Sequence, residues 1–336
     1  MKNIRYLLEF AAVWCGYRIL RLLPHSLVKF NAHIGAFFFA LIPGAMKVAT
    51  ANIHTAFPEK SAGECRRIAR KSFFHLVFNI SEFLWMSGSK RRIERWTTIP
   101  EPLRGELRRH VAEGRRIIFI NPHLGSWEGS GIMAPHFVEM NMVAVVKQIR
   151  NPYLDRLFNG GGRKLEAGVR LVYSKGAMRG ALKGLRDGYG IGILIDQNTR
   201  VRDGGVFVDF FGLPCPCSSA PPVLVDYCRK NNIPVVIYIG ASLREDNGVV
   251  AARAVTLRRP YEDYKSNAEM LQEIIEVSEG YIRSKPEQYL WFYKRFQYIP
   301  HGIDEVRRRR YPYYAIEPGE RFNSKIAATD AHNGKV

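Results

Sequence analysis

Cysteine is scarce in this chain of 336 residues, and its spacing excludes the common uses of the residue. The five cysteines are Cys15, Cys65, Cys215, Cys217 and Cys228. They form no Cys-x-x-Cys pair, and Cys215 and Cys217 are spaced wrongly for a zinc knuckle. We therefore expect no metal site and no bound cofactor. A scattered, odd set of thiols favours a catalytic domain that faces a reducing cytosol.

Acidic side chains are also in short supply, with 31 Asp and Glu against 50 Lys and Arg. The resulting net charge of +19 attracts anionic partners. Nucleic acid, an anionic membrane surface and a small acidic or phosphorylated partner all satisfy this condition. No nucleic-acid-binding module is recognisable, so we expect no nucleic-acid partner. A hydrophobic content of 46% is enough to bury a large core.

An uninterrupted apolar run of twenty residues is missing, although residues 1–46 are the most apolar part of the chain. The stretch 7–24 carries Glu9, Arg18 and Arg21, and the stretch 30–46 contains Pro43 and Gly44. Neither is a clean membrane span, and no cleavage site of a signal peptide follows. We expect residues 1–46 to form a membrane-associated helical element. A tilted span or hairpin, a helix pair lying in the interface, and an ordinary buried pair all remain open.

Short apolar runs alternate with helical patterns after this element. Such alternation predicts an α/β fold with a central, mostly parallel sheet flanked by helices, which we assign to residues 47–303. The predicted strands are 117–120, 142–146, 191–195 and 235–239, and the predicted helices between them are 127–137, 153–165 and 177–185. Capping boxes at 61–64 and 266–269 begin two more amphipathic helices. Residues 304–336 are polar, contain four consecutive arginines at 307–310, and are expected to form a poorly ordered tail.

The segment Asn-Pro-His-Leu-Gly-Ser-Trp-Glu at 121–128 follows a predicted strand, where sites form in parallel sheets. Two residues five apart on one helix point about 140° away from each other. His123 and Glu128 can therefore meet only if His123 lies on the loop. A histidine held by a carboxylate is a general base. No Gly-x-Ser-x-Gly nucleophile is present, so this base would activate a hydroxyl of the substrate. A structural histidine is the alternative, and a zinc site lacks a third ligand.

The motif resembles the signature of the late acyltransferases of lipid A biosynthesis, a branch of the lysophospholipid acyltransferase superfamily. Five further blocks similar to this family follow the same order and cover most of the chain: 52–58, 151–155 followed by Arg163, 192–197, 210–214 and 286–291. The resemblance implies an acyl carrier protein as donor and a phosphorylated glycolipid as acceptor. It also implies a location at the inner membrane, with the catalytic domain facing the cytoplasm.

The resemblance assigns roles to individual residues. His123 would be the general base and Glu128 the carboxylate that orients it. Substrate binding is expected from Arg163, Asp196, Gln197 and Arg295. The last block departs from many relatives, because Tyr293 replaces a histidine and titrates far above neutral pH. Tyr293 is therefore given no role in proton transfer.

The sequence leaves two rival functions open. The acceptor could be another lipid, such as a lysophospholipid, a glycosylated phosphoinositide or an amino lipid, and acyl-CoA could be the donor. A protein of another class, a non-catalytic lipid-binding membrane protein, could also use this fold. Lipid binding that does not depend on His123 and Glu128 would favour the second rival.

Overall fold

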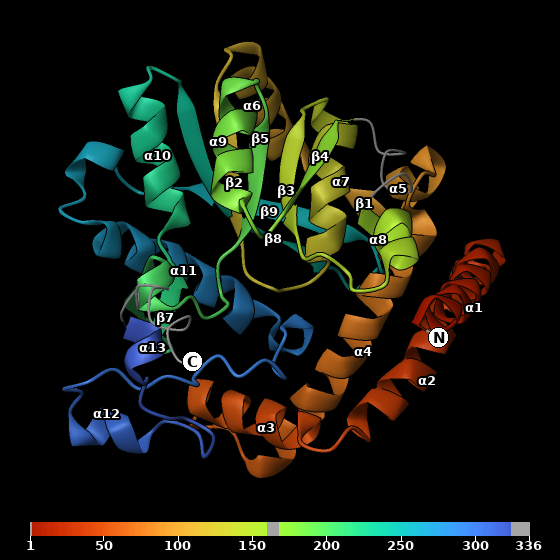
Figure 1. Cartoon of the computed structure of the whole chain (residues 1–336), viewed down its shortest axis with the longest axis horizontal. Helices are drawn as coiled ribbons and strands as arrows, with labels where there is room; N and C mark the ends of the chain where they lie inside the picture. Colours follow the sequence, from red (N-terminus) through yellow and green to blue (C-terminus); the bar gives the residue numbers. More distant parts are fainter. Residues whose placement is uncertain (1, 160–167, 324–336) are drawn as a thin grey trace, which may run out of the picture.

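The computed structural model describes residues 2–159 and 168–323, which are built around a seven-stranded sheet (Figure 1). The strand order is β1-β9-β8-β2-β5-β3-β4, and all neighbouring strands are parallel except the antiparallel pair β8 and β9. Its strands are β1 (Thr97–Thr98), β2 (Arg116–Asn121), β3 (Met142–Val146), β4 (Val169–Tyr173), β5 (Gly190–Leu194), β8 (Val235–Arg244) and β9 (Val250–Thr256). A second, antiparallel sheet pairs β6 (Gly205–Phe210) with β7 (Leu213–Ser218).

Helices cover both faces of the large sheet. The helices of the described residues are α1 (Lys2–Leu22), α2 (His25–Ala40), α3 (Ala45–Ala56), α4 (Ala62–Met86), α5 (Lys90–Trp96), α6 (Glu101–Ala112), α7 (Trp127–Val138), α8 (Pro152–Asn159), α9 (Ala177–Arg186), α10 (Ala220–Lys230), α11 (Asn267–Ser284), α12 (Glu305–Arg309) and α13 (Glu320–Asn323). The predicted α/β class with a mostly parallel sheet is therefore confirmed.

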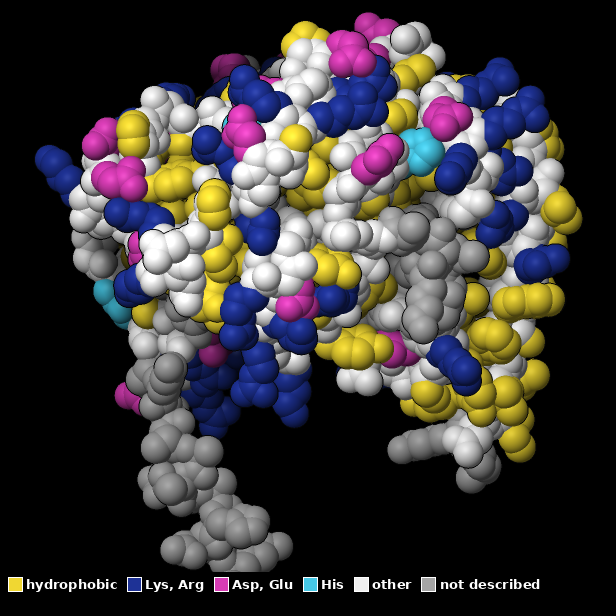
Figure 2. Space-filling model, turned by 90° about the horizontal axis from the view of Figure 1, so that it is seen from above, with side chains coloured by type: hydrophobic (Ala, Val, Ile, Leu, Met, Phe, Trp, Pro, Cys, Tyr) yellow, Lys and Arg dark blue, Asp and Glu magenta, His cyan; other side chains and the backbone are white. Residues whose placement is uncertain are grey.

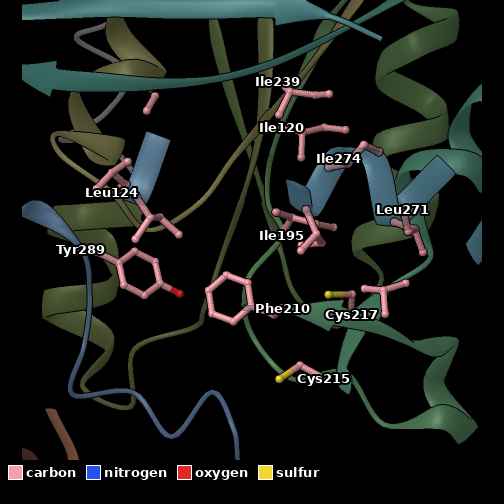
Figure 3. Close-up of a cluster of buried hydrophobic side chains, with 14 of the residues drawn as sticks. Ile120, Leu124, Ile195, Phe210, Cys215, Cys217, Ile239, Leu271, Ile274 and Tyr289 are labelled. Carbon is pink, nitrogen blue, oxygen red and sulfur yellow. The ribbon is translucent and has the colours of Figure 1, made fainter. Parts of the chain in front are cut away.

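Alternation along β2 decides which helices pack on which face. Ile117 joins a core with Leu107 of α6 and Met133 of α7. Ile118 and Ile120 point the opposite way, into a larger core shared with α9, α10 and α11. Figure 3 shows part of this larger core, where Ile120, Ile195, Ile239 and Ile274 lie together. Because both faces of β2 are buried, its run of isoleucines carries no polar alternation.

Most predicted strands and helices lie within one or two residues of the observed ones. The strand predicted at 235–239 is too short, because β8 continues to Arg244. The helix expected at 153–165 also differs, since α8 ends at Asn159 and the remainder lies outside the described residues. The capping box at the start of α4 is also present, with Ser61 and Glu64 bonded reciprocally. At α11 the side chain of Ser266 accepts the amide of Glu269, but the Glu269 carboxylate accepts instead from the amide of Lys265.

The N-terminal helices bury one narrow stripe and expose the rest of their apolar surface. Val28, Ala32 and Ala36 of α2 face the protein, whereas Phe37 and Phe38 are 63% and 62% exposed. Figure 2 shows apolar side chains gathered at the edge of the molecule where α1 and α2 lie in Figure 1. Among the described helices none is alone long and apolar enough to cross a membrane. Taken together, α2 and α3 reach a span's length and composition, but the two are bent by 92°.

The described part of the C-terminal segment is folded, contrary to the expectation of a poorly ordered tail. The hydroxyl of Tyr311 donates to the carbonyl of Pro214 at 2.7 Å. Phe322 of α13 is buried, and its ring lies 4.3 Å from that of Tyr298. Residues 304–323 therefore pack as part of the main domain.

Candidate active site

The sheet brings His123 next to Asp196. Strands β2 and β5 are parallel neighbours, and their register pairs Asn121 with Leu194. His123 and Asp196 each follow two residues later, so both leave the carboxyl edge of the sheet side by side. This edge is where open parallel sheets form their sites.

Asp196 fixes the orientation of the His123 ring. Its Oδ1 lies 2.7 Å from Nδ1 of the ring, and its Oδ2 accepts the backbone amide of His123 at 3.0 Å. Because a carboxylate only accepts hydrogen bonds, Nδ1 carries the proton and Nε2 carries the lone pair. The amide of Gln197 donates to that Nε2 at 3.2 Å. The ring therefore presents a basic nitrogen that is already engaged in a hydrogen bond.

Burial and charge act in opposite directions on this pair. Burial of His123 disfavours its charged form, but the charge and hydrogen bond of Asp196, together with the charge of Glu128, raise its pKa above the ordinary value. Asp196 is 2% exposed. Burial alone would raise the pKa of Asp196, but the His123 charge and hydrogen bonds lower it below the usual value. The pair thus combines an ionised aspartate with an imidazole that is more basic than a free histidine.

Glu128 lies in the first turn of α7 and lines the same cavity as His123. The negative charge of Glu128 raises the pKa of His123, but the carboxylate that hydrogen-bonds to Nδ1 is that of Asp196. The structure thus gives Asp196 the orienting contact that the sequence interpretation expected from Glu128. The ring of Trp127 adds an edge-on contact, with its centroid 5.5 Å from that of His123.

A cavity of about 1080 Å³ opens from these residues. His123, Glu128 and Gln197 lie on its wall, and most of the remaining lining is apolar. One part of that lining comes from Leu103 and Leu107 of α6 and from the helix α7. Another comes from α9 and from the ends of β3 and β5. A volume of this size lined by aliphatic side chains accepts hydrocarbon chains.

The other predicted site residues lie elsewhere. Arg295 is 1% exposed, and its guanidinium donates to Asn198 Oδ1 at 2.9 Å and to the Pro216 carbonyl at 2.8 Å. It is a buried structural cation and is not part of the cavity lining. The expectation that it binds substrate therefore has no support from its position. Arg163 falls outside the described residues.

Two features of the site escaped the sequence analysis. The pairing of Asp196 with His123 spans 73 residues and depends on the order of the strands. The signal that could have found it is the carboxylate directly after a predicted strand, provided that β5 is placed next to β2. The hydroxyl of Tyr293 accepts the backbone amide of Asn198 at 2.9 Å, so Tyr293 positions the chain that follows Asp196 and Gln197.

A parallel α/β sheet with a histidine–carboxylate pair at its carboxyl edge, above a deep apolar cavity, defines an enzyme that acts on acyl chains. Residues 1–298 match the sequence model of the bacterial lipid A biosynthesis acyltransferases, and the chain belongs to that family. It is accordingly an O-acyltransferase. This confirms the resemblance seen in the sequence.

Named relatives agree with this assignment. The chain is 24% identical over 299 residues to the lipid A biosynthesis lauroyltransferase of Escherichia coli (strain K12), covering 86% of this chain and 92% of the relative. It is 22% identical over 298 residues to the lipid A biosynthesis palmitoleoyltransferase of the same organism, with the same coverage. A lipid A biosynthesis acyltransferase of Shigella flexneri is also 22% identical over 298 residues, covering 86% of this chain and 92% of the relative.

Proposed function

We propose that this protein transfers a fatty acyl group from an acyl-carrier-protein thioester to a hydroxyl of a phosphorylated lipid A precursor. The observation that carries the proposal is the position of His123. Its Nδ1 is held by Asp196, its Nε2 meets the Gln197 amide, and both His123 and Gln197 line the apolar cavity. Family membership supports the acceptor class, and the geometry supports the assignment of His123 as the base.

The transfer then proceeds in a ternary complex without an acyl-enzyme. The acceptor hydroxyl displaces the Gln197 amide from Nε2 and gives its proton to that nitrogen as its oxygen attacks the thioester carbonyl. A new C–O bond forms, the C–S bond breaks, and the proton on Nε2 passes to the leaving sulfur. Asp196 and Glu128 stabilise the imidazolium between these two steps.

The hydroxyls near the base support a substrate nucleophile over an enzyme nucleophile. Ser126 is buried, and Ser130 Oγ lies 2.7 Å from Ser242 Oγ and 3.2 Å from the Ser126 carbonyl oxygen, so both serine side chains near the base lie within packed structure. Ser126 precedes α7 and Ser130 lies in its first turn, and neither has the Gly-x-Ser-x-Gly context that presents a catalytic serine.

The N-terminal helices are proposed to hold the enzyme at the inner membrane, with the catalytic domain on the cytoplasmic side. The exposed apolar side chains of α1 and α2 support this, because water disfavours a surface of that kind. The acceptor lipid would then reach the cavity from the membrane. The net charge of +19 would favour the acidic carrier protein and the phosphorylated acceptor.

Mass spectrometry of a reconstituted reaction tests the proposal. Membranes containing wild-type protein, acyl-carrier-protein thioesters and a lipid A precursor should yield the precursor plus one acyl chain. His123→Ala should lose about 10²- to 10⁴-fold in turnover, the typical contribution of a general base. His301→Ala, which changes an exposed histidine, serves as the matched control.

The alternatives give different products in the same experiment. Transfer from acyl-CoA but not from the carrier protein would show that acyl-CoA is the donor. Transfer to a lysophospholipid or an amino lipid would show that the proposed acceptor is wrong. Turnover of His123→Ala within about tenfold of wild type would contradict the assigned base, since a positioned base contributes more than that. No transfer with any of these pairs by folded protein would favour a lipid-binding role.

A further inference from the structure

The loop that carries His123 is fastened to its surroundings along its backbone. The carbonyl of His123 accepts the amide of Leu290 at 3.1 Å, and the amide of Gly125 donates to the Gln288 carbonyl at 3.0 Å. The amide of Ser126 donates to the Ser242 carbonyl at 2.7 Å. Gly125 has φ +62°, and a Cβ there would lie 2.1 Å from that same Ser242 oxygen. The loop therefore passes β8 so closely that only glycine fits.

A buried asparagine binds another backbone group of this turn. Nδ2 of Asn79, on α4, donates to the Gly125 carbonyl at 2.7 Å. Its Oδ1 accepts from Nη2 of Arg244 at 3.0 Å. Asn79 thus bridges the loop and a buried guanidinium at the end of β8, and both ends of its amide are used.

The guanidinium belongs to a buried pair of charges with Glu82, which reaches the partly buried His25 on α2. Nη1 and Nη2 of Arg244 donate to the two carboxylate oxygens of Glu82 at 3.1 Å and 2.5 Å, and Glu82 is 0% exposed. Nε2 of His25, on α2, lies 2.7 Å from the same carboxylate. The His25 ring also stacks on Trp96 with the centroids 3.5 Å apart. Gln288 closes the cluster by bonding both the backbone amide and the carbonyl of Arg244.

We propose that Asn79 is a positioning residue for acyl transfer, and that Arg244, Glu82 and His25 extend its hold from the catalytic loop to the N-terminal helix α2. The chain of contacts runs from the Gly125 carbonyl through Asn79, Arg244 and Glu82 to His25. It ties the geometry of the base to the helix whose opposite face exposes apolar side chains. The inference rests on the proposed acyl transfer for its functional consequence, but its structural content is independent of that function.

The proposal explains why polar and charged residues occupy these buried positions. A buried charge pair is weak as a source of stability, because desolvation of the charges offsets their attraction. Its best-attested use is to specify one arrangement of the groups around it. Here the arrangement that it specifies is the turn between His123 and Ser126.

Hydrogen exchange and kinetics together test the proposal in the full-length protein. Asn79→Asp keeps an acceptor for Arg244 but replaces the donor to the Gly125 carbonyl with a repelling oxygen. Peptides covering residues 121–130 should exchange about tenfold faster, since local opening is governed by lost contacts. The kcat for acyl transfer should fall about 10- to 100-fold at nearly constant KM, as expected for a misplaced base.

Matched variants separate positioning from a general loss of stability. Ser72→Ala removes another buried hydrogen bond of α4, to the Ala69 carbonyl, that does not reach the loop. It should leave exchange of 121–130 and kcat unchanged.

His25→Phe preserves the stack on Trp96 and removes the bond to Glu82. It should speed exchange of 121–130, and unchanged exchange there would overturn the link to α2. Asn79→Leu, of similar size, replaces Asn79→Asp if the charged variant does not fold.

Each outcome decides the proposal. Faster loop exchange with lower kcat supports it. Normal exchange, or faster exchange with kcat within about twofold of wild type, overturns it because misplacement of a base costs more. If the wild-type protein does not transfer acyl groups, the proposed function is wrong. Hydrogen exchange of residues 121–130 would still show whether Asn79 holds the loop.

Discussion

Two carboxylates serve His123 in different ways. Asp196 makes direct hydrogen bonds to the ring and to the backbone of the histidine, which fix its position and its tautomer. Glu128 stands on the next helix and acts through its charge. The difference matters because a hydrogen bond depends on geometry, whereas a charge acts over several ångströms. Substitution of each carboxylate should therefore have a distinct kinetic signature.

Asp196→Asn should lower kcat by about 10³- to 10⁴-fold, because an amide can donate to Nδ1 and so favours the wrong tautomer of the histidine. Steady-state kinetics of the purified variant measures this, and Asp226→Asn on the exposed face of α10 is the control. A loss of less than about tenfold would mean that Asp196 does not orient the base.

The pH dependence of kcat/KM follows from the raised pKa of His123. A general base must be neutral, and a pKa above 6.5 leaves it protonated at pH values where a free histidine has already lost its proton. Activity should therefore rise with pH along an acid limb centred above 6.5. Glu128→Gln removes a charge that raises this pKa, so its limb should move to lower pH. Glu262→Gln, an exposed control, should leave the limb in place, and a limb that Glu128→Gln does not move would refute this role of its charge.

At the scale of elements, strongly patterned segments were predictable and long-range pairings were not. A continuous apolar run predicts the buried strand at 117–120, and apolar residues at helical spacing predict the helix at 127–137. The pair β6–β7 does not, because Pro214 and Pro216 argue against a strand, yet both fit an isolated two-stranded hairpin. Its turn, Phe211-Gly212, has positive φ at both residues, as type I′ hairpins require.

The site was predictable in part for the same reason. His123 and Glu128 lie in one local motif, so their proximity could be argued from the loop-to-helix boundary. The bond between His123 and Asp196 depends on β5 lying next to β2, which no local pattern specifies. The prediction of a poorly ordered C-terminal tail was wrong for a different reason. The segment is mostly polar, but two of its aromatic residues, Tyr311 and Phe322, are buried against the main domain.

The exposed face of α2 leads to a prediction about the element as a whole. Phe37→Ser combined with Phe38→Ser should weaken binding to lipid vesicles by about tenfold or more, because each buried phenyl group contributes roughly 1.5–3 kcal/mol. Folding should be unaffected, since both rings are more than half exposed. Vesicle co-sedimentation measures the binding, and Val306→Ser combined with Ile316→Ser is the control, because it removes two exposed apolar side chains outside α1 and α2. Equal loss in both double variants would assign no special role to α2.

On the scale of the whole molecule, the surface divides into an apolar part over α1 and α2 and a broad basic part. Apolar side chains collect over α1 and α2, and Lys and Arg side chains spread over much of the face seen in Figure 2. The cavity behind His123 is lined mainly by apolar groups. A substrate with a charged head and hydrocarbon chains fits this division, as does an acidic protein that delivers a chain to the cavity.

The excess of positive charge predicts how the enzyme should respond to salt. Attraction between a protein of net charge +19 and an acidic carrier protein accelerates their encounter. Salt screens this attraction, with a Debye length that shrinks from about 30 Å at 0.01 M to about 8 Å at 0.15 M. The value of kcat/KM for the acyl-carrier-protein donor should therefore fall about tenfold or more over this range. The kcat at saturating donor should change little, because the buried His123–Asp196 pair is shielded from ions.

The control for that experiment is a short, uncharged acyl thioester in place of the carrier protein, assayed with the same acceptor. Its kcat/KM should change much less with salt, because it has no charge to be steered. If the two donors lose activity in parallel, the salt acts on the acceptor or the membrane. A flat response with the carrier protein would mean that the basic surface does not recruit the donor, and that its charge serves the phosphorylated lipid alone.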